Sequence, residues 1–253
     1  MTDFISKLIT DAEKRISAGY YDIDKVEHKP ISLAKKIKTA TNNAIIAEIK
    51  PISPTRGPLR PQLDPVATAL KLQSGGATGL SILTEPDNFG GSLHSLTSIR
   101  RHVRMPLLMK DIIIDDRQII AGMNAGADCI LLIQTVLSRR GIRATDLIAK
   151  AHDSQLEVLL EIHDNEELEY AITSNTDMVG INNRNLTNLA IDLNTTQKLL
   201  HSKIEDKVII TESGLETVED IRKMRKHVDG FLIGSSIMLA EDIESKVREF
   251  VLA

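Results

Sequence analysis

The stretch AIIAEIK, residues 44–50, is the first of eight short runs that decide the fold. Each run is largely apolar without strict alternation and is too short for a comfortable helix, which is typical of a parallel strand buried on both faces. Between the runs lie amphipathic segments, some with helix start signals such as Asp64-Pro65, Asp164 and Thr217. The eight runs are residues 44–50, 79–85, 106–110, 128–134, 157–163, 177–183, 207–213 and 230–235.

The order of these runs predicts the fold class. Strand and helix alternate throughout the 253 residues, with no break in composition that would mark a second domain. A closed (β/α)8 barrel, or TIM barrel, typically needs about 250 residues. We therefore expect an α/β fold with a single barrel domain over residues 1–253.

Residues 1–43 form an extension before the first strand. It contains two helical stretches, FISKLITDAEKRISA and SLAKKIKTA, which a minimal barrel does not require. Periodicity alone leaves two placements open. The extension could plug the N-terminal end of the barrel or form a lid over the active-site mouth.

The composition favours a small molecule as the partner. A net charge of -4 gives no electrostatic reason to expect nucleic acid or an anionic membrane. No apolar run is long enough to span a membrane, and the N-terminus lacks the apolar core of a secretory signal, so we expect a cytoplasmic protein. The oligomeric state stays open, and a monomer is compatible with this composition. The single Cys129 lies in the apolar run CILLI and is expected to pack in the core.

Ionisable residues end most of the apolar runs. In barrels of this kind the chemistry lies at the C-terminal ends of the strands. Because strand side chains alternate, Glu48 and Lys50 should point to the same side. Burying several charges together is costly unless they pair well or serve chemistry, so we interpret the set as catalytic rather than as an ordinary salt-bridged rim. We also expect burial to raise the pKa of the glutamates, and burial with neighbouring cations to lower that of the lysines. The set is Glu48, Lys50, Lys110, Glu161, Asn182 and Glu212.

Small residues end the seventh and eighth runs, as Ser213-Gly214 and Gly234-Ser235-Ser236. Backbone amides and hydroxyls there could contact an anion without interference from bulky side chains, and phosphate sites after strands seven and eight are frequent in this fold. We therefore expect a phosphorylated substrate.

The sequence predicts no metal and no cofactor. The seven histidines, including His94, His102 and His163, lack the close pairing of metal ligands and are interpreted as solvated or capping side chains. Nothing resembles a GxGxxG motif or a P-loop, and Gly75-Gly76 and Gly90-Gly91 are interpreted as turns.

Taken in order, the strand ends resemble those of the indole-3-glycerol phosphate synthase family. The resemblance spans almost the whole chain, and EIKxxSP and GINNRNL are its specific motifs. The matching segments are AEIKPISPTRG (47–57), LLMKDIIID (107–115), GADCILLI (126–133), LLEIHDNEEL (159–168), VGINNRNL (179–186), ITESGL (210–215) and FLIGSSIM (231–238).

The resemblance implies ring closure of 1-(2-carboxyphenylamino)-1-deoxyribulose 5-phosphate to an indole, with loss of carbon dioxide and water, in tryptophan biosynthesis. It implies that Lys110 is the general acid that protonates the ribulose carbonyl oxygen. Glu161, Lys50 and Glu48 would serve the later proton transfers, in an order that stays open. Asn182 and Glu212 would orient the sugar hydroxyls and the acid-base groups.

The resemblance also implies the substrate contacts. Ser53 and Arg184 would contact the anthranilate end, and Phe89, Ile112 and Leu131 would form an apolar wall. The phosphate would lie against Ser213, Gly214, Gly234 and Ser235, with Lys50 nearby. The family places its N-terminal helical extension across the active-site mouth, which favours the lid.

Three positions depart from the usual family pattern. Ile112 stands where an aromatic residue is usual, Thr55-Arg56 replace Ser-Lys, and Gly234-Ser235-Ser236 replaces Gly-Glu-Ser. None of these changes removes an ionisable group expected to be catalytic.

Three alternative functions fit this sequence less well. Phosphoribosylanthranilate isomerase would have a cysteine at the end of the first strand, where this chain has Glu48 and Lys50. A class I aldolase would use Lys110 or Lys50 as a Schiff-base amine. A barrel kept only as a scaffold would be expected to lack a strand-end ionisable residue, and none is missing.

Overall fold

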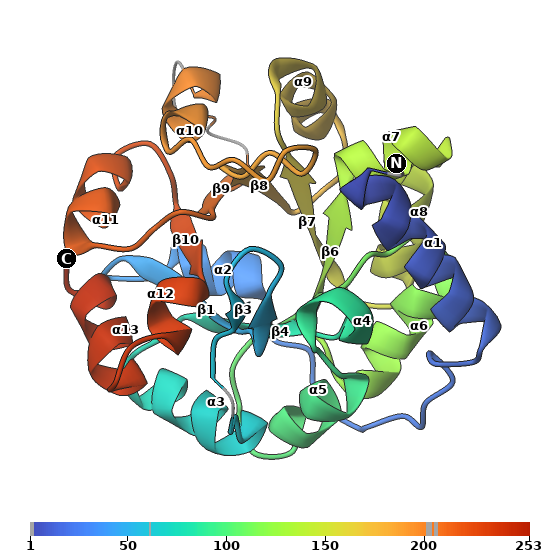
Figure 1. The fold of residues 1–253 in the computed structure, drawn as a ribbon, viewed down its shortest axis with the longest axis horizontal. Coiled ribbons are helices and arrows are strands. Elements are labelled where there is room, and N and C mark those ends of the chain that lie inside the picture. The colour runs from blue at the N-terminus through green and yellow to red at the C-terminus, as the bar shows by residue number, and fades with distance from the viewer. Residues whose placement is uncertain (1–2, 61, 201–203, 205–206) are drawn as a thin grey trace.

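Eight parallel strands close into a barrel in the computed structural model, which describes residues 3–60, 62–200, 204 and 207–253. Figure 1 looks down on this barrel, with helices in a ring around it. Each strand pairs with the next strand of the list below, and the last pairs with the first, so the predicted α/β barrel is confirmed. The strands are β1 (Ala44–Ile49), β4 (Gly79–Leu83), β5 (Leu107–Lys110), β6 (Cys129–Ile133), β7 (Glu157–Ile162), β8 (Met178–Asn182), β9 (Val208–Glu212) and β10 (Gly230–Ile233).

The helices between the strands form the outer layer. Asp64 caps α3 with Pro65 in the first turn, Asp164 caps α9, and Thr217 forms a capping box with Asp220 at α11, so the three expected helix starts are confirmed. The helices of this layer are α3 (Pro65–Ser74), α4 (Pro86–Phe89), α5 (Leu93–Arg100), α6 (Asp116–Ala125), α7 (Gln134–Arg140), α8 (Ala144–Asp153), α9 (Asn165–Thr173), α10 (Asn194–Leu199), α11 (Val218–Met224), α12 (Ser235–Met238) and α13 (Ile243–Val251).

The strands supply most of the core. Almost every strand residue is buried, because the inner face fills the barrel and the outer face packs under the helices. Cys129 is a fully buried free thiol on β6, as expected for core packing. Among the described helices, none is long and apolar enough to cross a membrane.

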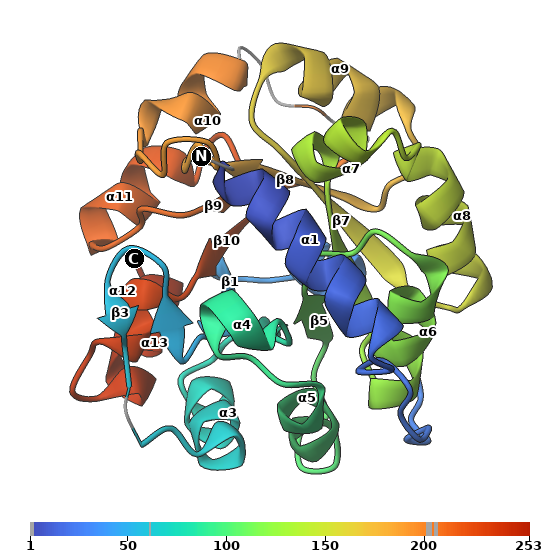
Figure 2. The same ribbon diagram turned by 45° about the vertical axis from the view of Figure 1, so that its right-hand side comes forward.

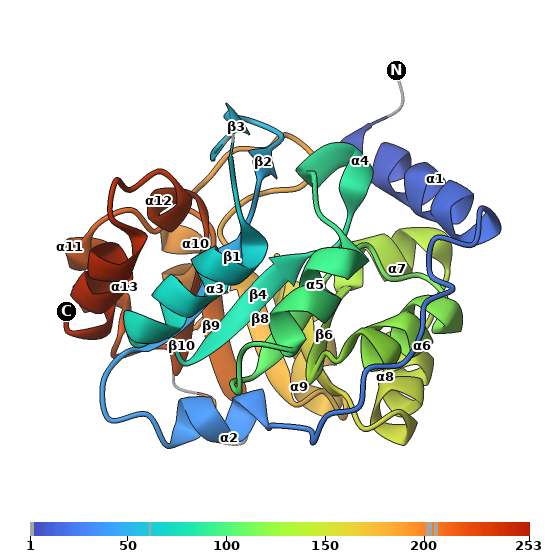
Figure 3. The same cartoon turned by 90° about the horizontal axis from the view of Figure 1, so that it is seen from below.

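A short hairpin that the sequence analysis did not predict follows β1. It consists of β2 (Ile52–Ser53) and β3 (Gly57–Pro58), which pair antiparallel. In Figure 3 it rises on the same side of the barrel as α4 and α1 (Phe4–Ser17). The hairpin carries Ser53 and holds Thr55 and Arg56 at its tip.

The two N-terminal helices lie at opposite ends of the barrel. Helix α1 lies at the rim of the mouth, on the side of the barrel that carries α6 and α7 (Figure 1, Figure 2), whereas α2 (Leu33–Lys38) lies at the far end (Figure 3). Glu157, at the start of β7, accepts hydrogen bonds from the Leu33 and Ala34 amides at 2.7 and 3.0 Å. Of the expected extension 1–43, α1 therefore lies at the mouth end of the barrel and α2 at the opposite end; residues 1–2 lie outside the described residues.

Candidate active site

An ammonium group stands among three carboxylates at the mouth of the barrel. Lys110 Nζ lies 2.7 Å from Glu212 Oε2, 3.4 Å from Glu48 Oε1 and 4.0 Å from Glu161 Oε2. These residues come from β5, β9, β1 and β7, so strands distant in sequence converge on one point. Lys50 adds a second ammonium, 3.0 Å from Glu48 Oε2, which places Glu48 and Lys50 on the same side.

Asn182 completes the group. Its side-chain amide donates to Glu161 Oε1 at 2.9 Å, and its oxygen accepts from the Arg184 amide. Asn182, Glu161, Glu48 and both lysines line one cavity at the mouth, whereas Glu212 is fully buried and reaches the site through Lys110. The structure thus brings together the six residues singled out at the strand ends.

The charges of this cluster set its proton affinities. Burial alone would lower the pKa of Lys110, but Glu212, Glu48 and Glu161 outweigh burial and raise it. The expectation that lysine pKa values are lowered is therefore wrong for Lys110, because three carboxylates surround it. Burial would raise the pKa of Glu48, yet Lys50 and Lys110 lower it.

Glu212 carries the opposite shift. Burial, helped by the charges of Glu161 and Glu48, raises its pKa to about 7 even though Lys110 opposes the change. Two ammonium groups cannot neutralise three carboxylates, so the most buried carboxyl keeps its proton longest. Near neutral pH the cluster therefore contains a lysine that stays cationic and a glutamate close to its titration midpoint.

Two glycines make room for the carboxylates. A Cβ added at Gly180 on β8 would collide with Glu212 Oε1, and one added at Gly234 would collide with Glu48 Oε2. From the sequence, Gly234 was expected only to contact the phosphate, and Gly180 had no predicted role. Each glycine fixes the position of a charged group on a neighbouring strand.

Small residues line the side of the cavity beside β9 and β10. Ser213, Gly214, Gly234 and Ser235 all lie there, and the left-handed backbone at Ser213 (φ +67°) and Gly214 (φ +81°) shapes the turn after β9. Ser236 Oγ donates to the Leu215 carbonyl at 2.8 Å, which ties the loops after β9 and β10 together.

The remaining predicted contacts also line the cavity. Phe89, Ile112 and Leu131 contribute apolar surface, and Ser53 and Arg184 contribute polar groups. Arg184 Nη1 donates to the Leu189 carbonyl at 3.1 Å and to Thr55 Oγ1 at 3.4 Å, so the loop after β8 contacts the hairpin after β1. Arg56 at the hairpin tip pairs with Glu216 after β9.

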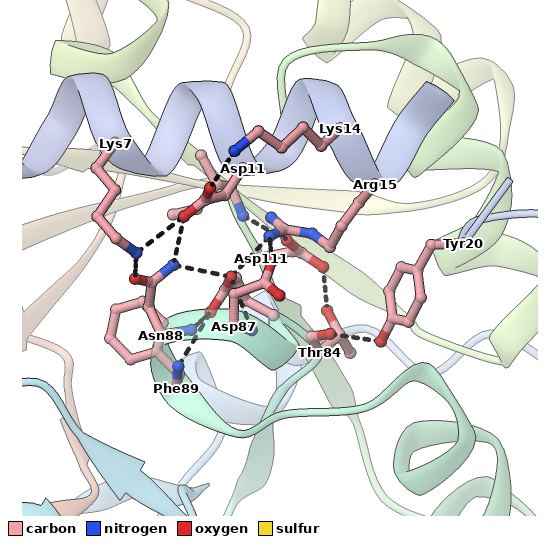
Figure 4. Close-up of polar contacts among 12 residues, drawn as sticks. Lys7, Asp11, Lys14, Arg15, Tyr20, Thr84, Asp87, Asn88, Phe89 and Asp111 are labelled. Carbon is pink, nitrogen blue, oxygen red and sulfur yellow. Dashed lines mark hydrogen bonds and ion pairs between the residues drawn. The ribbon is translucent and has the colours of Figure 1, made fainter. Parts of the chain in front are cut away.

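Helix α1 contributes to the wall of the cavity through Phe4 and Leu8. A buried ionic cluster, which we call the anchor cluster, holds the other end of α1 (Figure 4). Arg15 Nη1 contacts Glu85 Oε1 at 2.7 Å and also pairs with Asp87, and its Nη2 lies 3.7 Å from Asp111 Oδ1.

The anchor cluster was missed because its members are far apart in sequence. Arg15 lies in a helix that reads as an ordinary amphipathic segment, and Glu85 and Asp111 each follow a strand by one or two residues. A second missed residue is His163, which is not solvated but stands behind Glu161 with Nε2 3.6 Å from Glu161 Oε1. Its position directly after the EVLLEI strand, two residues from Glu161, could have indicated that it lies beside the site. Within the part of the chain that is described, no group of three or more His, Cys, Asp or Glu could hold a metal ion.

Comparison with known proteins gives the family. The sequence profile described as indole-3-glycerol phosphate synthase matches residues 6–250. This chain belongs to the indole-3-glycerol phosphate synthase family. An enzyme of that name from Methanocaldococcus jannaschii is 42% identical over 91% of this chain and 87% of its own length. One from Campylobacter jejuni is 41% identical over 88% and 86%.

A solved structure shares the fold at lower identity. A thiamine phosphate pyrophosphorylase from Pyrococcus furiosus aligns with a TM-score of 0.61 and 18% identity over 87% of this chain and 96% of that chain. Indole-3-glycerol phosphate synthases are decarboxylating lyases of tryptophan biosynthesis that act on a small phosphorylated substrate.

Proposed function

We propose that this protein closes the ring of 1-(2-carboxyphenylamino)-1-deoxyribulose 5-phosphate to give indole-3-glycerol phosphate, carbon dioxide and water. The observation that carries the proposal is the Lys110 ammonium, held by three carboxylates beside a cavity with one apolar side and one side of small residues. A cytoplasmic location stays a prediction from the N-terminal sequence.

Lys110 is the general acid of the first step. The ring carbon that bears the carboxylate attacks the ribulose carbonyl carbon, and Lys110 donates a proton to the carbonyl oxygen as that carbon–carbon bond forms. The bond to the carboxylate then breaks, and its electron pair restores the aromatic ring as carbon dioxide leaves. The raised pKa of Lys110 keeps it protonated in the free enzyme, which suits an acid and disfavours a Schiff-base amine.

Glu161, Lys50 and Glu48 serve the dehydration. The hydroxyl formed in the first step leaves as water after it gains a proton, and loss of a further proton gives the indole double bond. Lys50 contacts Glu48, Glu161 lies 4.0 Å from Lys110, and all four line the cavity, so groups able to act as acid and as base both face it. Asn182 and Glu212 orient Glu161 and Lys110 through contacts of 2.9 and 2.7 Å.

The two ends of the substrate meet different walls. The phosphate lies against Ser213, Gly214, Gly234 and Ser235, whose small side chains line the cavity, and Lys50 contacts Glu48 beside Gly234. The anthranilate ring lies against Phe89, Ile112 and Leu131. Its carboxylate meets Ser53 and Arg184, beside the positive charge of Arg56. Phe4 and Leu8 of α1 add apolar surface to a wall in which Ile112 replaces the usual aromatic residue.

The direct test is to mix the purified protein with the substrate and to follow the rise of indole fluorescence. Turnover by the wild type, with no stable adduct on Lys110 or Lys50 after borohydride treatment, supports acid-base ring closure. Absence of indole from a folded wild-type protein overturns the proposal.

A further inference from the structure

His163 occupies a position behind the catalytic carboxylates that the proposed chemistry does not use. Its imidazole stands between two glutamates: Nε2 lies 3.6 Å from Glu161 Oε1, and Nδ1 lies 3.6 Å from Glu167 Oε2. The side chain is 13% exposed and does not line the cavity. His163 therefore contacts Glu161 on the side away from the substrate site.

The imidazole is held in place by Glu167 of α9 and Thr135 of α7. Glu167 accepts the His163 backbone amide at 2.8 Å and the Thr135 hydroxyl at 2.6 Å, and Thr135 Oγ1 lies 3.3 Å from His163 Nδ1. His163 Nε2 is buried and has no hydrogen-bond partner among the described residues. The imidazole thus presents this nitrogen to Glu161 across a short gap.

The surroundings of His163 are strongly anionic. Glu161 on β7, Glu167 on α9 and Glu212 on β9 all act on the imidazole, and Lys110 Nζ lies 4.0 Å from the other carboxylate oxygen of Glu161, Oε2. Burial alone would lower the pKa of His163, but Glu167 and Glu161 outweigh burial and raise it. The cationic form of His163 is therefore more favoured than that of a free imidazole.

We propose that His163 is a positioning residue for Glu161: anchored by Glu167, its imidazole holds the Glu161 carboxylate in place for the proton transfers of the dehydration. This inference rests on the proposed function. It assigns to Glu161 three orienting partners, which are Lys110, Asn182 and His163. A purely structural histidine would instead affect stability without changing the pH dependence of turnover.

The test compares pH profiles of kcat for the wild type, His163→Asn and Glu167→Gln. His163→Asn removes a titratable imidazole that lies 3.6 Å from Glu161 Oε1, so the acidic limb of kcat should move up by about one pH unit. Below the midpoint kcat then falls about ten-fold, and KM changes little because His163 does not face the cavity. Glu167→Gln keeps an acceptor for the His163 amide but removes the anchoring charge, so it shifts the limb less, in the same direction.

A surface pair provides the matched control. His152 Nε2 lies 2.9 Å from Asp177 Oδ2, outside the cavity lining, and His152→Asn should leave the profile unchanged. An acidic limb that stays in place in both His163→Asn and Glu167→Gln overturns the inference, even if kcat falls uniformly. If His163→Asn does not fold, the Glu167→Gln profile decides the matter alone.

A measurement without substrate separates this inference from the proposed function. The titration midpoint of the His163 imidazole, followed by NMR, should lie above the ordinary value of about 6.5 and should fall in Glu161→Gln. If the wild type shows no turnover but the His163 midpoint still falls in Glu161→Gln, the proposed function is refuted and the coupling between His163 and Glu161 stands. A midpoint that does not move refutes the coupling.

Discussion

Two ionic clusters in this protein each surround a buried cation with carboxylates and have different surroundings. Around Lys110 stand Glu48, Glu161 and Glu212, and around Arg15 stand Glu85, Asp87 and Asp111. Each cluster places three carboxylates around a central cation, and Lys50 adds a second cation to the Lys110 cluster. The two clusters differ in the groups that donate hydrogen bonds to the carboxylates and in the cation that the carboxylates surround.

In the anchor cluster, backbone amides donate hydrogen bonds to the carboxylates. Glu85 accepts the amides of Asp87, Asn88 and Phe89, and Asp111 accepts the Ile112 amide and the Thr84 hydroxyl. In the described residues, no backbone amide donates to a carboxylate of the Lys110 cluster, and Lys110 and Lys50 face the cavity. An arginine keeps its proton under all ordinary conditions, whereas a lysine can transfer one. A lysine that faces a cavity among carboxylates without backbone donors therefore indicates chemistry, and an arginine among carboxylates that accept from backbone amides indicates structure.

The largest expected effect is on turnover when the cation of the first cluster is removed. Lys110→Met should fold and should lose about 10²- to 10⁴-fold in kcat, because the proton donor of the first step is gone. Indole fluorescence at saturating substrate measures the loss, and circular dichroism checks the fold. A rate near that of the wild type would show that Lys110 is not the acid.

A smaller loss is expected when Glu212 is displaced without a change of charge. In Gly180→Ala the new methyl group collides with Glu212 and breaks its contact with Lys110, so kcat should fall about 10- to 100-fold. Gly141→Ala is the matched control, since its added Cβ has nothing within 4 Å and only strains a left-handed backbone at the end of α7. Equal losses of kcat in both variants would mean that the effect of Gly180 is not specific to the site.

The same removal of the cation in the anchor cluster should change stability and substrate affinity, not the chemical step. Arg15→Met leaves Glu85 and Asp111 buried with fewer partners, and the free energy of unfolding should fall by about 3 kcal/mol. Hydrogen exchange of α1 should accelerate, and KM should rise because Phe4 and Leu8 line the cavity. A loss of kcat as large as that of Lys110→Met would contradict the claim that the anchor cluster is structural and the Lys110 cluster catalytic.

The pH dependence of stability sharpens the comparison further. The pKa of Glu212 is raised by burial to about 7, so this carboxyl binds its proton more tightly folded than unfolded. Its contribution to stability is therefore greatest at low pH and declines as the pH rises from about 4.5 to 7. Urea unfolding should show that the free energy of unfolding of Glu212→Gln rises by about 2 kcal/mol relative to that of the wild type across that range. A constant difference between the two proteins would argue against a raised pKa.

Much of the fold follows from local signals in the sequence. The eight apolar runs became the eight strands, and Asp64, Asp164 and Thr217 cap helices as expected. Since the C-terminal ends of parallel strands meet at one end of a barrel, the convergence of Glu48, Lys110 and Glu161 could be predicted as soon as the barrel was.

What could not be predicted depends on contacts between segments distant in sequence. The need for glycine at position 180 exists only because Glu212 of the next strand occupies the space of a Cβ. The raised pKa of Lys110 depends on the count of carboxylates around it, which no spacing reveals. The separate positions of α1 and α2 depend on Arg15 meeting Glu85 and on Glu157 meeting the amides of α2.

The measurement that most directly tests the central claim is a crystal structure of Lys110→Met with the substrate trapped, compared with a wild-type complex of the product. We predict phosphate oxygens within about 3 Å of the amides of Gly214 and Ser235, and Lys110 Nζ of the wild type directed at the carbon that was the ribulose carbonyl. A phosphate bound elsewhere, or a ligand that leaves Lys110 and its three glutamates without contact, would contradict the account.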